Sequence, residues 1–238
     1  MIRDELLELF ESSRQSIKTV IERVMPSCGA SDLNRAAKNM AVLVNGSIKL
    51  PGDGWGYPLV CDVALFEAND RGVRPFDRFL TGPARALAGP EQDLARRMGR
   101  AFFSLFKFTA MHETGGIWVE DILDDNRRIW IMEILLEDRE KFPEIFGMRI
   151  FDAGPFHLSL GSIAYANASI VRICATAVAA KRRLPFRHGL ASTLYGLMLM
   201  RDRPNHPSGI RFVRDLALVL NNFPAAPTPD NGKTARGP

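Results

Sequence analysis

The stretch AFFSLFKFTAMHETGGIWVEDILDDNRRIWIMEI, residues 101–134, decides the fold. Before residue 101 the apolar residues recur at helical spacing, whereas from 101 to 166 they form short β-type runs separated by turn signals. After residue 166 the helical spacing returns. This order predicts an α+β fold with N-terminal helices, a five-stranded antiparallel meander or small β-barrel, and C-terminal helices.

The strands are predicted from apolar runs and from the turns between them. Turn signals lie at 113–116, at Asp124-Asp125-Asn126 and at Asp152-Ala153-Gly154-Pro155. The expected strands are 102–109, 117–119, 128–135, 148–151 and 156–160. Apolar residues occupy more than one face of these strands, which favours a strongly bent or closed sheet. The aromatic side chains expected to be largely buried are those of Phe103, Phe106, Trp130 and Phe151.

Residues 1–100 predict a series of helices. The first, 2–25, places Leu6, Phe10 and Ile17 on one apolar stripe. A second is expected to start at Ser31 or Asp32 and to end at Asn45-Gly46. The Gly/Pro cluster 51–58 predicts a turn, because it lacks the GxxxxGK[ST] pattern of a phosphate loop. The remaining helices are expected at 59–68, 75–80 and 91–100.

The C-terminal part divides into a basic helical segment, 167–223, and a tail, 224–238. The helical segment is expected to pack on the rest of the protein. The tail is rich in Pro, Ala, Thr, Gly and charge, which predicts disorder. The expected helices are 168–180, 190–200 and 210–221.

Composition indicates a cytoplasmic globular protein without membrane contact. Of its 238 residues 46% are hydrophobic and 24% charged, the ordinary proportions of a globular chain. The acidic N-terminus does not have the apolar core of a signal peptide, and no apolar run reaches the length needed to span a bilayer. Cys28, Cys61 and Cys174 are widely spaced and odd in number, which predicts free thiols in a reducing compartment.

Charge is distributed unevenly along the chain. The net charge is +4 overall, but residues 166–238 hold 11 basic and 3 acidic residues, whereas the stretch 113–144 holds 10 acidic residues and 4 basic ones. The candidate nucleic-acid-binding or partner-binding residues are Arg182, Arg183, Arg187 and His188. Two interpretations stay open: this basic cluster docks on the acidic stretch of the same or a neighbouring chain, or it contacts phosphates. Docking is favoured, because Phe186 is the only aromatic residue among the arginines and stacking on nucleic acid needs more.

The sequence carries no familiar catalytic signature, and we predict neither a cofactor nor a metal ion. The four histidines form no HExxH motif, and no GxSxG is present. A metal or acid–base site made of His112, His157 and Asp121 stays an alternative, because neighbouring strands bring distant residues together. Asp121, Asp124 and Asp125 are explained more simply as solvated, turn-forming acidic residues than as a cation or acid–base site.

Two pieces of the chain, DVALFEANDRGVRPFDRFL (62–80) and GIWVEDILDDNRRIWIMEI (116–134), carry a resemblance. Their layout resembles uncharacterised bacterial proteins in which a helical segment precedes a β meander and a zinc-binding SEC-C tail follows. The resemblance covers about a third of the chain. The cysteine-rich tail is missing here, so the resemblance implies no metal and no function for this protein.

Three hypotheses for the function follow. The first is a binding or assembly module without catalytic activity, which forms a homo-oligomer or binds a protein partner. The second is a nucleic-acid-binding protein that uses the basic C-terminal third. The third is an enzyme of unidentified class with its site among His112, Asp121 and His157.

Overall fold

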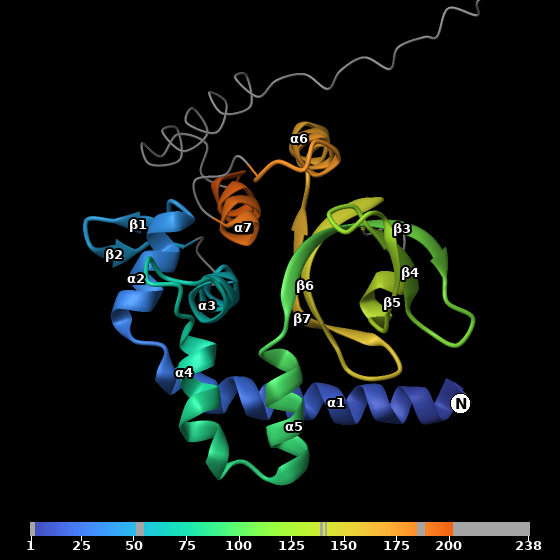
Figure 1. Ribbon diagram of the computed structural model, residues 1–238, viewed down its shortest axis with the longest axis horizontal. Coiled ribbons are helices and arrows are strands. Elements are labelled where there is room, and N and C mark those ends of the chain that lie inside the picture. The colour runs from blue at the N-terminus through green and yellow to red at the C-terminus, as the bar shows by residue number, and fades with distance from the viewer. Residues whose placement is uncertain (1–2, 51–54, 139, 141, 185–188, 202–238) are drawn as a thin grey trace, which may run out of the picture.

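The computed structural model describes residues 3–50, 55–138, 140, 142–184 and 189–201. It confirms the predicted α+β class: N-terminal helices, a five-stranded and mostly antiparallel sheet closed as a ring, and C-terminal helices. In Figure 1 the long helix α1 runs beneath the ring, α2, α3, α4 and α7 lie to one side of it, and α6 lies above. Among the described residues no helix is long and apolar enough to cross a membrane.

Amphipathic spacing produces the N-terminal helices. The stripe predicted for α1 is buried, with Leu6, Phe10 and Ile17 facing the core. Proline occupies the first turn of α3, α4 and α5, where its missing N–H costs nothing. The helical elements of this part are α1 (Arg3–Val24), η1 (Met25–Ser27), α2 (Ala30–Asn39), α3 (Tyr57–Phe66), α4 (Pro75–Thr81), η2 (Pro83–Ala86) and α5 (Gly89–Met98).

The second predicted helix is shorter than expected. It ends at Asn39, and a small hairpin of β1 (Leu43–Val44) and β2 (Ser47–Ile48) follows. Asn45 and Gly46 have φ angles of 49° and 76°, the left-handed geometry that a two-residue hairpin turn requires at both positions. The Asn-Gly pair therefore marks a hairpin and not the end of a helix.

The ring is built from β3 (Phe102–Met111), β4 (Ile117–Asp121), β5 (Arg127–Ile131), β6 (Ile145–Asp152) and β7 (His157–Tyr165). The strand order is β3-β4-β5-β7-β6, and β6 pairs with β3 to close it. β3 is long enough to pair with both neighbours, through residues 106–111 with β4 and 102–107 with β6. The expectation of purely antiparallel strands is wrong at one pair, because β5 and β7 run parallel where Ile131 meets His157.

The third strand also ends earlier than predicted. It stops at Ile131, and a 3₁₀ helix, η3 (Ile134–Glu137), replaces its second half. This turn puts Leu136 inside the ring and leaves Leu135 67% exposed. The ring interior is filled by apolar side chains, so any ligand of the ring has to bind at its ends or outer surface. The interior residues are Phe106, Ile117, Val119, Ile129, Ile131, Leu136, Phe146, Met148 and Ile150.

The expectation for the aromatic core is confirmed in part. Phe106 and Phe151 are fully buried. Phe103 and Trp130 are only half-buried, because their side chains lie on the outside of the ring wall. Phe103 meets Tyr195 of α7 at 5.5 Å between ring centroids, and Trp130 stacks on His112 at 3.7 Å.

The C-terminal helices α6 (Ala168–Ala179) and α7 (Leu190–Arg201) match two of the three expected ones. α7 packs against both the helical part and the ring, with Leu194 and Tyr195 fully buried. The predicted helix 210–221 and the predicted disordered tail 224–238 lie outside the described residues.

Candidate anion-binding pocket

Three arginines converge where α5 leads into the first strand of the ring. Arg96 and Arg97 lie in the last turn of α5, and Arg100 follows in the turn before β3. Gly99 makes this tight junction feasible, since a Cβ there would lie 2.5 Å from Cδ1 of Leu80. β5 begins at the same end of the ring and adds Arg127.

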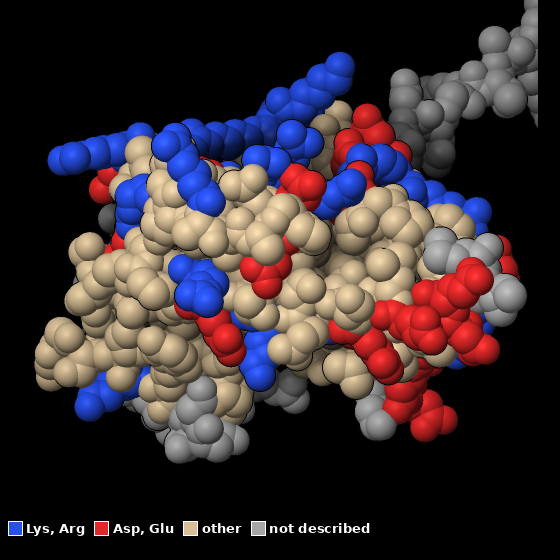
Figure 2. Space-filling model, turned by 90° about the horizontal axis from the view of Figure 1, so that it is seen from below, with Lys and Arg blue, Asp and Glu red and all other residues tan. Residues whose placement is uncertain are grey.

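These side chains line a cavity of about 490 Å³, which we call the arginine pocket. Figure 2 looks at this end of the molecule, and basic side chains gather along the upper part of the view, with a block of acidic ones at the end where α1 begins. Four guanidinium groups face two carboxylates, which gives the pocket a positive excess. Its lining residues are Asp93, Arg96, Arg97, Arg100, Phe102, Arg127, Asp152 and His157.

Three of the four guanidinium groups have weak, exposed partners. Arg96 donates to Asp93 at 2.6 Å, Arg97 lies 3.7 Å from the Asp152 carboxylate, and Arg127 donates to Asp124 at 2.8 Å. Exposed pairs of this kind are worth only about 0–1 kcal/mol each, so an incoming anion can displace them.

The fourth guanidinium, that of Arg100, differs from the other three. It is exposed, and its side chain forms no ion pair or hydrogen bond with any described residue.

His157 adds a neutral polar group to the pocket. Burial lowers the pKa of its imidazole, and the neighbouring Arg127 lowers it further, whereas Asp152 acts in the opposite direction. A neutral ring has one nitrogen that donates and one that accepts.

A second, smaller cavity of about 280 Å³ adjoins the arginine pocket, and we call it the polar recess. Its buried carboxylate belongs to Asp121, which accepts hydrogen bonds from the Ser104 hydroxyl and from the Leu123 N–H at 3.0 Å. Burial raises the pKa of Asp121. The recess is lined by Phe102, Phe103, Ser104, Asp121, Leu123, Asp124 and Arg127, so it shares Phe102 and Arg127 with the arginine pocket.

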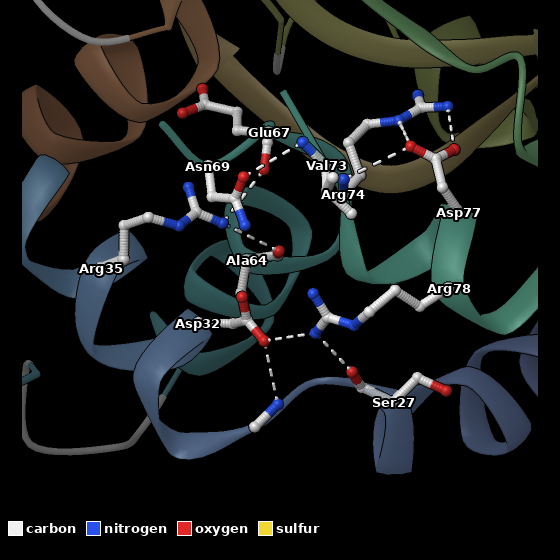
Figure 3. Close-up of polar contacts among 11 residues, drawn as sticks. Ser27, Asp32, Arg35, Ala64, Glu67, Asn69, Val73, Arg74, Asp77 and Arg78 are labelled. Atoms are coloured by element: carbon white, nitrogen blue, oxygen red, sulfur yellow. Dashed lines mark hydrogen bonds and ion pairs between the residues drawn. The ribbon is translucent and has the colours of Figure 1, made fainter. Parts of the chain in front are cut away.

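Other arginines of the helical part are already used inside the fold (Figure 3). Arg35 donates to the backbone carbonyls of Ala64 and Glu67 at the end of α3, at 3.4 and 3.0 Å. Arg78 joins Asp32 of α2 to the carbonyl of Ser27, at 2.6 and 2.9 Å. These groups hold helices together, which sets them apart from the arginine pocket.

The residues predicted from the basic C-terminal cluster lie elsewhere. Arg182 and Arg183 are exposed, and Arg183 lines a cavity near the end of α3 together with Arg35 and Lys38. Arg187 and His188 lie outside the described residues.

Two acidic residues of the stretch 113–144 form ion pairs with arginines of α1. Within the described part of the chain, Glu133 pairs with Arg14 and Glu137 with Arg3, both on α1. Neither Arg182 nor Arg183 forms an ion pair with a described residue. Docking of the cluster on a neighbouring chain stays a prediction.

The structure does not bring His112 together with Asp121 and His157, which line two adjoining cavities. His112 stacks on Trp130 on the outer wall, and its Nδ1 accepts the Thr114 N–H at 3.1 Å. Asp121 lies in the polar recess and His157 in the arginine pocket. In the part of the chain that the structure describes, no three His, Cys, Asp or Glu residues are grouped closely enough to hold a metal ion.

Reasoning from the sequence missed the arginine pocket. The signal was the run Arg96-Arg97-Met98-Gly99-Arg100 at the end of a helix, directly before the first strand of the ring. Basic residues are common at helix C-termini, where they stabilise the helix dipole, so this run alone did not point to a site. Arg127 joins it only through the fold.

No curated protein and no solved structure matches the chain. The model of a family of unknown function (DUF7986) matches residues 4–170. That range includes every residue of the arginine pocket and the polar recess, and ends before Arg182. Because the match covers more than half of the 238 residues, the chain belongs to this family of unknown function (DUF7986).

Proposed function

We propose that the protein is a binding module without catalytic activity that holds a phosphate-bearing ligand in the arginine pocket. One observation carries the proposal: four guanidinium groups from α5, its following turn and β5 face one cavity, and the Arg100 side chain has no described partner. The proposal keeps the first hypothesis, a binding module, and moves the site from the C-terminal third to the end of the ring.

The chemistry of the pocket suits phosphate. The planar guanidinium fork donates two parallel hydrogen bonds to phosphate or carboxylate oxygens. A volume of about 490 Å³ lies in the range of small-ligand pockets.

A simpler interpretation is that Arg96 and Arg97 only compensate the negative end of the α5 dipole. That effect is worth about 0.3–1 kcal/mol per cation. Compensation of a helix dipole does not require that the basic side chains line a common cavity. Dipole compensation also gives no reason for Arg127, which comes from β5, to face the same cavity.

The test is calorimetric titration of the purified protein with inorganic pyrophosphate. Arg100→Glu should weaken binding at least about tenfold, because it removes a donor and adds a like charge. Arg85→Glu is the matched control, since Arg85 is an exposed arginine on η2 outside the pocket, and its affinity should stay within about twofold. Equal affinities for wild type and Arg100→Glu, with unchanged melting temperatures, would refute the proposal.

Cytoplasmic location stays a prediction that thiol chemistry can test. All three cysteines are free, and burial raises the pKa of Cys28 to about 11 and that of Cys174 to about 12. We expect a thiol reagent to leave both unmodified in the native protein, because the reactive thiolate is suppressed, and to titrate three thiols per chain after unfolding. Finding a single thiol in the unreduced, unfolded protein isolated from its own cells would contradict a reducing compartment.

A further inference from the structure

We propose that the ligand is a nucleotide unit, with its phosphate in the arginine pocket and its base against Phe102, facing the polar recess. This inference rests on the proposed function. The shared chemistry is one phosphate joined to one base, which a free nucleotide and the end of a nucleic-acid strand both offer.

The continuity of the two cavities is the first argument. The arginine pocket and the polar recess adjoin each other, because Phe102 and Arg127 line both of them. One side of this joint site supplies guanidinium groups from Arg96, Arg97 and Arg100. The other side supplies aromatic and polar groups. A ligand that fits both sides of this joint site has an anionic group at one end and a flat polar group at the other.

Phe102 is placed to stack on the flat end. It is the first residue of β3 and only half-buried, although its neighbour Phe106, 6.5 Å away between centroids, is fully buried. The guanidinium of Arg127 lies 5.8 Å from the centre of the Phe102 ring. A base on Phe102 would therefore meet a π face and a cation together, both of which attract nucleobases.

Asp121 is placed to recognise the edge of a base. Its Oδ1 atom accepts the hydrogen bonds from Ser104 and Leu123, which leaves Oδ2 as the acceptor without a described donor. The carboxylate lines the recess but is otherwise buried. An exocyclic amino group of cytosine, adenine or guanine can donate a hydrogen bond to this carboxylate oxygen.

The acidic rim limits how much nucleic acid the site can hold. Asp93, Asp124 and Asp152 surround the guanidinium groups and would repel the further phosphates of a long backbone. We therefore expect recognition of one nucleotide and not of an extended strand.

The experiment compares four small probes by calorimetry: CMP, UMP, ribose 5-phosphate and pyrophosphate. CMP should bind at least about tenfold tighter than ribose 5-phosphate, which has the same phosphate and sugar but no base. UMP has a carbonyl in place of the amino group and an N3–H in place of the N3 acceptor, so it loses the hydrogen bond from the amino group and should bind several-fold more weakly. Asp121→Asn should reduce this preference, because its amide can donate to the uracil carbonyl.

Phe102→Leu is the decisive variant. It keeps an apolar side chain against the ring core and removes only the aromatic face, and melting temperatures check that it folds. It should erase the advantage of CMP over ribose 5-phosphate and leave pyrophosphate affinity within about twofold of wild type. Arg100→Glu should weaken all four probes.

The outcomes separate the two proposals. If pyrophosphate does not bind, or if Arg100→Glu leaves its affinity unchanged, the proposed function and this inference are both refuted. Pyrophosphate binding with equal affinities for CMP and ribose 5-phosphate refutes only the inference. A 5′-phosphorylated oligocytidylate distinguishes the sources: affinity equal to that of CMP identifies a free nucleotide, and much tighter, strongly salt-dependent binding identifies a strand end.

Discussion

Replacing Arg149 with Ala should lower the free energy of unfolding by about 3–5 kcal/mol, the cost of leaving one charge of a buried pair without its partner. Arg149 lies on β6, and its Nε donates to both carboxylate oxygens of Asp62 on α3, at 2.9 and 3.1 Å. Both side chains are buried. The guanidinium carbon also lies 5.0 Å from the centre of the Phe66 ring. This contact joins the helical part to the ring.

Arg149→Ala is destabilising because it leaves a buried, desolvated carboxylate without a cation, and not because the ion pair itself is strong. Removing Arg149 leaves the Asp62 carboxylate buried without its cation, whereas replacing both residues by apolar ones removes both charges. The double variant Asp62→Leu/Arg149→Met should therefore be more stable than Arg149→Ala. Urea unfolding followed by circular dichroism measures both variants. A loss below about 1 kcal/mol for Arg149→Ala would show that water reaches this pair.

Replacing Phe106 with Ala should cost about 3–5 kcal/mol, through lost transfer free energy and the cavity left in the ring. Phe106 is fully buried, and its ring lies 6.2 Å from that of Phe146 across the interior. Trp130→Ala should cost less, because Trp130 is half-buried on the outer wall.

Leu135→Ala is the control for Phe106→Ala. Leu135 is an apolar residue of η3, but it is 67% exposed, so its truncation should change the stability by no more than about 0.5 kcal/mol. Equal losses for Phe106→Ala and Leu135→Ala in the same urea assay would show that the ring interior is not packed as described.

Local patterns fixed much of the fold in advance. The stripe of Leu6, Phe10 and Ile17 predicted α1, because a helix brings every third and fourth residue to one face. The apolar run Ile117-Trp118-Val119, directly after the turn signal at 113–116, predicted β4. These signals are local, so neighbouring residues suffice to read them.

The errors arose where a local signal had two interpretations. Asn45-Gly46 can end a helix or turn a hairpin, and packing of β1 on β2 selected the hairpin. The apolar run 128–135 continues through Ile134 and Leu135, but the ring has to close, so the chain turns and puts Leu136 inside. Burial in the closed ring outweighed β propensity there.

The candidate site was the least predictable part, since its residues come from distant segments. The sequence by itself determined the α+β order, most of the strand and helix positions and the basic run at 96–100, because each depends on a pattern within a few residues. Only the tertiary structure decided that β5 pairs in parallel with β7, that Arg127 joins Arg100 in one pocket, and that Asp62 meets Arg149. Such contacts depend on how the ring closes and on which charges must be buried together, and no pattern along the chain encodes either.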